Sequence, residues 1–424
     1  MDRSRDQPPT RLTTSDRATV ATEIAEALAE QSVVVDEGGS TWVTRVDGRT
    51  VSIGPGLYGG TSGVALFLAA WAHCDAGVGA REIADRAWAP LRRSAAAWRR
   101  RGTVRTAPLG LGRGVSSVAY AMAVAGDLLD DDGMVGEAVR LFSAVPVVSI
   151  DTEDRFDVLG GLAGALLCGS ALETLGRRRG LDVGACSALA DRAARRLCAQ
   201  AIPLPELVGP DGEPAVGWAP RPGARIVSGM AHGTAGIVMA LSRWAVRGTT
   251  EVDATVRAGL AMERATFARH LGNWLDRRVD HERAMTMWCH GGPGIALARL
   301  AMLGPSDDRH VIDEIEAGLA VAVSAPLDEG ADHLCCGHLG RAELLFAAGR
   351  RFDRPAAIRQ ATERLDLVAT RWRTGRAHLG AGDTGPRSDP GFFLGLAGLG
   401  SGLLRRHHPA RLPSIGAFEV AAPV

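Results

Sequence analysis

One glycine-centred motif recurs seven times along the chain, and this repetition is the feature that most limits how the chain can fold. The motifs align on an anchor glycine, and in six of them a second glycine follows three residues later, whereas Ser117 takes that place in the second repeat. The anchors, which are 54, 47, 72, 58, 46 and 58 residues apart, are Gly60, Gly114, Gly161, Gly233, Gly291, Gly337 and Gly395. A repeat of this length indicates stacked structural units rather than unrelated domains.

Each motif is followed by an apolar run, such as VALFLAAW or IVMALSRW, which is typical of a helix buried on most sides. The stretches between these runs are amphipathic, as in REIADRAWAPLRRSAAAWRR, which is typical of a helix with one face in solvent. Each spacing leaves room for two helices of about 11–14 residues. Because the first and last repeats resemble the others and lack polar caps, we expect the stack to close on itself. The predicted fold is all-α, an α/α toroid with seven inner and seven outer helices.

The toroid is expected to span residues 18–408, between a disordered N-terminal tail (1–17) and a C-terminal tail (409–424) with little helical signal. An alternating pattern from Thr41 to Ile53 around Asp47-Gly48 predicts a small β-hairpin near the N-terminus. The stretch from Pro203 to Pro222 is rich in proline and glycine, so it is predicted to be an extended loop.

Charge and hydropathy argue against several classes of partner. The 48 basic and 48 acidic residues give a formal net charge of zero, so no field favours nucleic acid or an acidic membrane surface. The first 16 residues lack the apolar segment of a secretion signal. The most apolar stretch, Ile53 to Cys74, has six glycine and proline residues in its first half, so it is a poor membrane span. We therefore expect a cytoplasmic protein whose seven cysteines are buried or bind metal.

The two positions before the anchor glycine depart from the repeat pattern in three neighbouring repeats. There they hold Ala231-His232, Cys289-His290 and Cys335-Cys336. In a toroid all seven turns converge on one end of the central cavity, so these side chains should meet. Three thiolates with a fourth position open are typical of a catalytic zinc site. The sequence thus predicts zinc ligation by Cys289, Cys335 and Cys336, whereas Arg113, which also precedes an anchor, is expected to affect packing more than chemistry.

His232 and His290 share these positions and are predicted to be catalytic imidazoles. Asp157 lies four residues before its anchor glycine, where two interpretations remain open. Its carboxylate either accepts backbone N–H bonds at the start of a helix or orients and charges His232 from the neighbouring repeat. His333 and His338, which flank the paired cysteines, are expected either to support the metal site from outside or to lie at the surface.

These motifs resemble the lanthionine synthetase C family, and the resemblance extends from Gly56 to Arg406 with all seven glycine motifs in order. The most specific segments are WCHGGPG, LCCGHLG, SGMAHGTAG and FDVLGGLAG. The resemblance implies an α/α toroid with a zinc ion at one end, held by Cys289 and by the pair before Gly337. It also assigns acid–base roles to the positions of Asp157, His232 and His290, and it implies cyclisation of dehydrated precursor peptides.

One departure from the family pattern concerns the second ligand motif, which is Cys-Cys-Gly here and commonly Cys-His-Gly in stand-alone cyclases. In this respect the chain is similar to the cyclase half of class II lanthipeptide synthetases. Those proteins also carry a large dehydratase, for which the stretch before the first motif is too short. We therefore expect a dehydrated leader–core peptide as substrate and a separate dehydratase as partner.

The expected reaction is the addition of a peptide cysteine thiolate, ionised at the zinc, to a dehydroalanine or dehydrobutyrine of the same peptide, followed by protonation of the α-carbon by a histidine. Two alternatives remain open at this point. One is a transferase that adds a glutathione-like thiol to dehydrated residues, and the other is a non-catalytic peptide-binding scaffold that keeps zinc for structural reasons. A glycosidase on an α/α barrel is disfavoured because Asp157 is the one carboxylate close before an anchor glycine.

Overall fold

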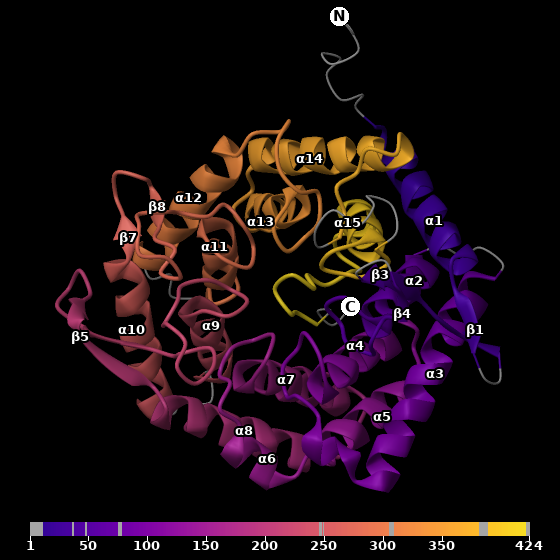
Figure 1. The fold of residues 1–424 in the computed structure, drawn as a ribbon, viewed down its shortest axis with the longest axis horizontal. Coiled ribbons are helices and arrows are strands. Elements are labelled where there is room, and N and C mark those ends of the chain that lie inside the picture. The colour runs from indigo at the N-terminus through magenta and orange to yellow at the C-terminus, as the bar shows by residue number, and fades with distance from the viewer. Residues whose placement is uncertain are drawn as a thin grey trace, which may run out of the picture.

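The computed structural model describes residues 12–35, 38–46, 49–74, 79–245, 248, 250–304, 309–380 and 389–420. Within these ranges the chain forms fifteen α-helices and eight short strands. The helices are arranged as a ring with two layers (Figure 1). The predicted α/α toroid is therefore confirmed.

The inner layer holds the seven helices that begin directly after the anchor glycines. Their side chains are apolar on nearly all sides and almost entirely buried, as the absence of a polar stripe predicts. They are α2 (Thr61–Cys74), α4 (Val115–Leu128), α7 (Leu162–Arg178), α9 (Thr234–Ala245), α11 (Gly292–Leu300), α13 (His338–Arg351) and α15 (Leu396–His407). Each contacts the next inner helix along the chain, and α15 contacts α2, so the layer is closed.

Six outer helices follow their inner partners in sequence and pack against them through one apolar face. They are α3 (Ala80–Arg101), α5 (Asp132–Ser143), α8 (Gly184–Ala199), α10 (Thr250–Ala265), α12 (Arg309–Ser324) and α14 (Pro355–Arg373). A short helix, α6 (Val147–Thr152), precedes the third motif and packs against α8.

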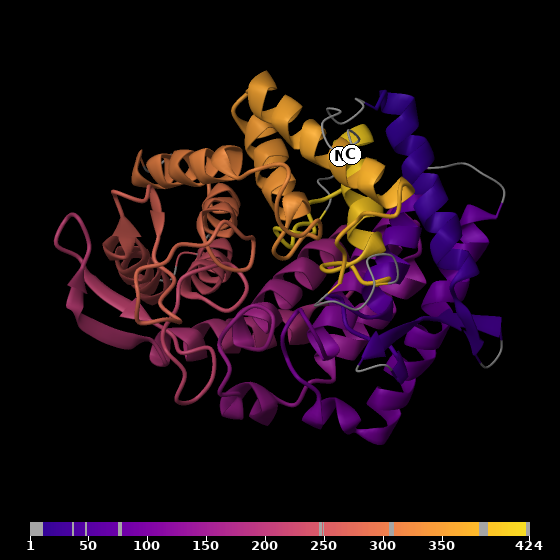
Figure 2. The same ribbon diagram turned by 45° about the horizontal axis from the view of Figure 1, so that its top comes forward.

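The seventh outer helix is the first helix of the chain. Helix α1 (Thr14–Glu30) packs against α15, and both views show the two side by side (Figure 1, Figure 2). Thr13 and Asp16 form a capping box at its start, which fixes the beginning of the helix. The predicted tail over residues 1–17 is therefore too long, since the helix begins at Thr14 and residues 1–11 lie outside the described part.

A ring of backbone hydrogen bonds joins the seven turns at one end of the toroid. In every repeat the N–H two residues before the anchor glycine donates to the carbonyl of the equivalent residue in the next repeat, at 2.8–3.3 Å. The ring passes through Tyr58, Gly112, Leu159, Ala231, Cys289, Cys335 and Phe393, and Phe393 donates to Tyr58 to close it. Because these residues share one position in the repeat, the ring fixes where the neighbouring side chains lie.

The anchor glycines are required mainly because the backbone passes so close to them. A Cβ on Gly161 would lie 1.9 Å from the carbonyl oxygen of Arg155, and one on Gly291 would lie 1.8 Å from that of Met285. Of the seven anchors only Gly114 and Gly291 have a positive φ, of 103° and 116°. The expected left-handed conformation therefore explains two anchors, whereas the close approach explains all of them.

The strands form four two-stranded antiparallel sheets outside the helical layers. They are β1 (Val33–Val35) with β2 (Gly39–Thr41), β3 (Val43–Val46) with β4 (Arg49–Ser52), β5 (Ile202–Val208) with β6 (Pro214–Gly217), and β7 (Phe267–Ala268) with β8 (Asn273–Trp274). The β3–β4 pair is the predicted hairpin, although its turn residues 47–48 lie outside the described part. The prediction of a loop from Pro203 to Pro222 is wrong in part, because β5 and β6 occupy much of this stretch.

The C-terminal segment, expected from residue 409 as a tail with little helical signal, folds back into the ring over residues 409–420. The indole of Trp288 donates to the carbonyl of Gly416 at 2.9 Å, and the hydroxyl of Tyr120 donates to that of Glu419 at 2.6 Å. The buried ring of Phe418 packs on Phe393 and Trp288. The segment thus ties several inner helices together, and its yellow ribbon lies inside the ring in Figure 1.

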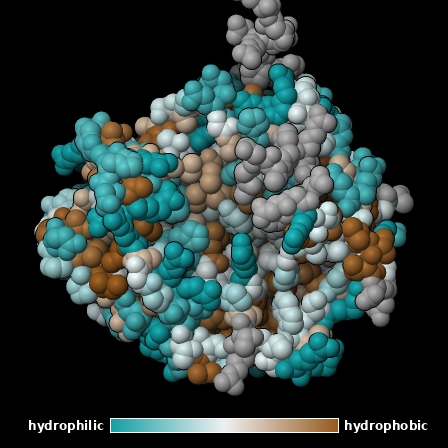
Figure 3. All heavy atoms as spheres, viewed as in Figure 1, coloured by the Kyte–Doolittle hydropathy of each residue, from teal (hydrophilic) through white to brown (hydrophobic). Residues whose placement is uncertain are grey.

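The end of the toroid that faces the viewer in Figure 3 is largely hydrophilic. Hydrophobic side chains gather at its right-hand edge, where β1 exposes Val33 and Val34 (Figure 3). None of the helices in the described ranges is both long and apolar enough to cross a bilayer.

Candidate active site and metal centre

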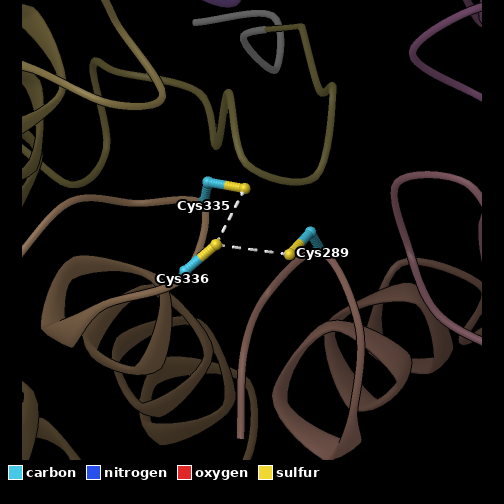
Figure 4. A group of neighbouring side chains, drawn as sticks. All are labelled: Cys289, Cys335 and Cys336. Atoms are coloured by element: carbon cyan, nitrogen blue, oxygen red, sulfur yellow. Dashed lines mark hydrogen bonds between the residues drawn. The ribbon is translucent and has the colours of Figure 1, made fainter. Parts of the chain in front are cut away.

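Three cysteines meet where the fifth and sixth turns adjoin. The backbone N–H of Cys289 donates to the carbonyl of Cys335 at 3.1 Å, which holds the two turns in contact. The Sγ atom of Cys336 lies 3.5 Å from that of Cys289 and 3.4 Å from that of Cys335. Figure 4 shows that Cys335 and Cys336 come from one turn and Cys289 from the other, with their sulfurs directed toward one another.

This arrangement fits a tetrahedral zinc ion. With Zn–S bonds of about 2.3 Å, neighbouring sulfurs in a tetrahedral site lie roughly 3.8 Å apart. The three Sγ atoms all lie within 4.8 Å of one another, so small side-chain rotations would suffice. All three cysteines also line a cavity of about 930 Å³. A fourth coordination position would therefore be accessible to a ligand in this cavity.

The three thiols differ in how readily they ionise. Hydrogen bonding with Cys289 and Cys335 lowers the pKa of Cys336, which favours the thiolate form at this sulfur. Hydrogen bonds to the other two sulfurs, followed by burial, raise the pKa of Cys289 far above its usual range. Because three thiolates at these distances would repel one another, a cluster in which all three are ionised requires a positive ion between them.

The sequence left two roles open for Asp157, a contact with the backbone of its own turn and a contact with His232. The structure shows both contacts. Its Oδ1 atom accepts the N–H of Gly160 within its own turn, and its Oδ2 atom lies 3.2 Å from Nδ1 of His232 in the neighbouring repeat. The carboxylate is buried, whereas the His232 side chain is 44% exposed. Since Nδ1 faces the carboxylate, Nε2 is the ring nitrogen that remains available to a ligand in the cavity.

His290 lines the same cavity from the fifth repeat. Its ring centroid lies 6.0 Å from that of His232, so both imidazoles reach one space. The side chain is buried, and its Nδ1 atom has no hydrogen-bond partner. Burial, followed by the charges of Arg278 and His232, lowers the pKa of His290 to about 4.

Three further residues of the cavity wall were not predicted as functional. Tyr58 stacks on Phe393 and lies beside Cys335, and Arg113, for which a role mainly in packing was expected, also lines the cavity. Tyr58 precedes its anchor glycine by two residues and Arg113 by one. This shared position in the repeat was the sequence signal that could have identified them. Arg278 comes from the loop after β8, where no periodicity marks it, and is held by Asp276 through two hydrogen bonds of 2.8 Å.

The two histidines that flank the paired cysteines are both buried, so neither lies at the surface. Nδ1 of His333 accepts the backbone N–H of Cys336 at 3.2 Å and so fixes the turn that carries this cysteine. His338 interacts through Nδ1 with Arg341 and Arg364 behind the turn. The contact of His333 repeats that of Asp157, because in both turns a side chain four residues before the anchor accepts the N–H one residue before it.

The fold and the site together define a closed α/α toroid with three converging thiols and a carboxylate–imidazole pair at one end. A family model described as lanthionine synthetase C-like protein matches residues 52–416, and the chain belongs to this family. Membership confirms the resemblance found in the sequence and the enzyme class, a thioether-forming cyclase.

A solved structure named nisin cyclase is similar to the chain, with a TM-score of 0.60 and 16% sequence identity. The match covers 96% of this chain and 98% of the other, so the two share the whole toroid. No curated protein sequence matches the chain.

Proposed function

We propose that the protein is a zinc-dependent lanthipeptide cyclase. In the proposed reaction the sulfur of a peptide cysteine bonds to the β-carbon of a dehydroalanine or dehydrobutyrine in the same peptide. The C=C double bond becomes a single bond and the α-carbon takes up a proton in place of the one that the thiol loses, so no oxidant or reductant is needed. The convergence of three thiols and the Asp157–His232 pair on one cavity is the observation that carries this proposal.

Cys289, Cys335 and Cys336 are the residues that would hold the metal. When bound there, zinc supplies the positive charge that ionises a substrate thiol at its fourth position. The remaining roles, which are positioning and proton transfer, belong to residues of the protein. Backbone hydrogen bonds between the turns hold the three cysteines in place at the wall of the cavity.

His232 is the imidazole best placed to deliver a proton to the α-carbon. Asp157 holds Nδ1 and so orients the ring, which leaves Nε2 as the nitrogen available to the cavity. The carboxylate is itself fixed by the N–H of Gly160, so it cannot turn away from the imidazole. His290 reaches the same space and is the second candidate for acid–base work.

The proposed substrate is a dehydrated precursor peptide, because the acceptor is an alkene next to a carbonyl. Such an alkene must be supplied by a reaction that eliminates water from serine or threonine, so we infer a separate dehydratase. All seven cysteines of this chain are free thiols, which supports a reducing location such as the cytoplasm.

A synthetic peptide with one cysteine and one dehydroalanine four residues apart would test the proposal. Ring closure leaves the mass unchanged but removes the free thiol, so alkylation followed by mass spectrometry measures it. We expect closure by the zinc-loaded protein, loss of closure in Cys289→Ala, and retention in Cys198→Ala, which removes a thiol from the outer helix α8. Unchanged thiol content with the zinc-loaded protein would contradict the proposal.

The same assay separates the alternative functions. With added glutathione, a transferase would increase the mass of the peptide by one glutathione and leave its own cysteine free. A binding scaffold would retain the peptide on a column without changing its thiol content. A cyclase would give neither result.

A further inference from the structure

The seven positions directly before the anchor glycines surround one end of the toroid, and one polar side chain among them has no role in the proposed reaction. Around the ring these positions hold Gly59, Arg113, Gly160, His232, His290, Cys336 and Leu394. His232, His290 and Cys336 belong to the proposed chemistry. Arg113 lines the same cavity and remains unexplained.

Arg113 lies as far from the thiol site as the ring permits. In the closed order of hydrogen-bonded turns, the second repeat is three turns from the fifth, which carries Cys289, and three turns from the sixth, which carries Cys336. Its neighbours in the same position are Gly59 and Gly160, which have no side chains to cover it. Arg113 therefore lies on the side of the cavity opposite the cysteines.

The cavity wall also contains Arg155, Arg278 and Arg283, but two of these are neutralised. Arg155 donates to both carboxylate oxygens of Glu153 at 2.9 and 3.0 Å, and Arg278 donates to both of Asp276 at 2.8 Å. Hydrogen bonds from Arg278 hold the pKa of Asp276 below its usual value, so this carboxylate stays ionised.

In contrast, no carboxylate in the described part of the chain forms an ion pair with Arg113 or Arg283, and the contact of Arg283 is with Sδ of Met285 at 3.1 Å. The wall thus carries positive charge, on Arg113 and Arg283, that no ion pair in the described part of the chain neutralises. A guanidinium binds a carboxylate through two parallel hydrogen bonds, which gives both affinity and orientation.

We propose that Arg113 binds a carboxylate of the substrate peptide while the reacting cysteine lies at the thiol site across the cavity. This inference rests on the proposed function, since the substrate class follows from it. The carboxylate belongs either to an Asp or Glu side chain near the reacting cysteine or to the C-terminus of the peptide. In either case the contact holds the peptide at a second point, across the cavity from the reacting cysteine, and so favours particular substrates.

Binding can be measured without turnover. The probe is a fluorescein-labelled peptide with its cysteine intact and serine in place of dehydroalanine, prepared in three forms. The first has glutamine beside the cysteine and a C-terminal amide, the second has glutamate at that position, and the third has a free C-terminal carboxylate. Fluorescence anisotropy with the zinc-loaded protein gives the dissociation constant of each, and the two acidic forms distinguish the two sources of the carboxylate.

We expect one acidic form to bind about fivefold more tightly than the neutral form, the upper end for a solvent-accessible ion pair. Arg113→Gln should reduce this ratio to about one, and Arg113→Lys should retain part of it. Arg100→Gln removes the same charge from the exposed end of outer helix α3 and should leave the ratio unchanged. Circular dichroism checks that each variant is folded.

A ratio near one in the wild-type protein, or an equal ratio in Arg113→Gln, would overturn the subsite. The ring-closure assay with the same three peptides, now carrying dehydroalanine, distinguishes this failure from that of the proposed function. Closure without preference for acidic peptides leaves the cyclase and removes the subsite. Acid-selective binding that depends on Arg113, without closure of any peptide, supports the subsite and contradicts the cyclase.

Discussion

The carboxylate of Asp157 lies 3.2 Å from Nδ1 of His232, although 75 residues separate them in the sequence. The two side chains come from adjacent turns of the toroid, and the second oxygen of Asp157 accepts the N–H of Gly160. One residue therefore both stabilises its own turn and orients an imidazole in the next. These two tasks can be separated, because an asparagine can accept the N–H but carries no charge.

We expect Asp157→Asn to fold and to bind zinc like the wild type but to close peptide rings about tenfold more slowly or worse. The reason is that the imidazolium of His232 loses its stabilising charge while Nε2 keeps its place. Ring closure by thiol alkylation measures the effect, and Asp151→Asn, on the surface helix α6, is the matched control. A wild-type rate in Asp157→Asn would show that the carboxylate serves only the turn.

The three-thiol site predicts about one zinc ion per chain by elemental analysis. Cys289→Ala, Cys335→Ala and Cys336→Ala should each lose the metal, because two remaining sulfurs leave the tetrahedral site incomplete. Cys198→Ala should keep it. Cobalt substitution should give the intense sulfur-to-cobalt absorption of a thiolate site in the wild type. A folded protein that binds no zinc would exclude the proposed mechanism.

His333 is expected to hold the metal site through the Cys336 turn, since its Nδ1 atom accepts the N–H of that cysteine. His333→Ala should weaken zinc binding about tenfold, as losses of groups that support metal ligands do. His333→Asn should restore most of it, because the amide oxygen can accept the same N–H. Competition with a chromophoric chelator measures both, and equal affinities in the two variants would argue against this hydrogen bond as the cause.

A buried charge cluster on the outer side of the ring makes stability depend on pH. Glu263 and Arg299 are fully buried and ion-paired at 3.2 Å, and Arg299 also pairs with Glu314. Burial outweighs the attraction of Arg299 and raises the pKa of Glu263 to about 7. A carboxyl whose folded pKa is raised stabilises the fold fully below its unfolded pKa of about 4.5 and loses this contribution as the pH rises toward 7.

The stability of the wild type should therefore fall by about 3 kcal/mol between pH 4.5 and 7 through this group alone. Glu263→Gln should remove that part of the pH dependence, whereas Glu316→Gln, at a surface ion pair with Arg354, should not. Urea unfolding at several pH values measures the slope. Parallel slopes in the wild type and Glu263→Gln would mean that another group titrates.

Two adjacent glycines of the first repeat provide a test of the packing argument. A Cβ on Gly60 would lie 2.2 Å from the carbonyl oxygen of Gly54, whereas a Cβ on Gly59 would meet nothing within 4 Å. We expect Gly60→Ala to destabilise the fold by about 2 kcal/mol or more and Gly59→Ala to change stability little. Thermal unfolding compares them, and equal losses would show that backbone entropy, not the close approach, sets the requirement for glycine.

The architecture could be predicted because the toroid is periodic in sequence as well as in space. Each anchor glycine marks a turn where the backbone passes too close for a side chain, and each apolar run marks an inner helix. Cys289 and Cys335 stand at equivalent positions in neighbouring repeats and Cys336 follows Cys335 directly, so their convergence follows from the closed ring alone. The repeat register alone was therefore sufficient to predict where a metal site should lie.

The aperiodic parts required the tertiary structure. That α1 supplies the seventh outer helix, and that residues 409–420 enter the ring, depends on which surfaces remain uncovered after the repeats have closed. The loop that carries Asp276 and Arg278 has no repeat position, so only its folded path brings these residues to the cavity. The repeats determine where equivalent residues lie, but contacts between non-equivalent segments depend on long-range packing, which no local pattern in the sequence records.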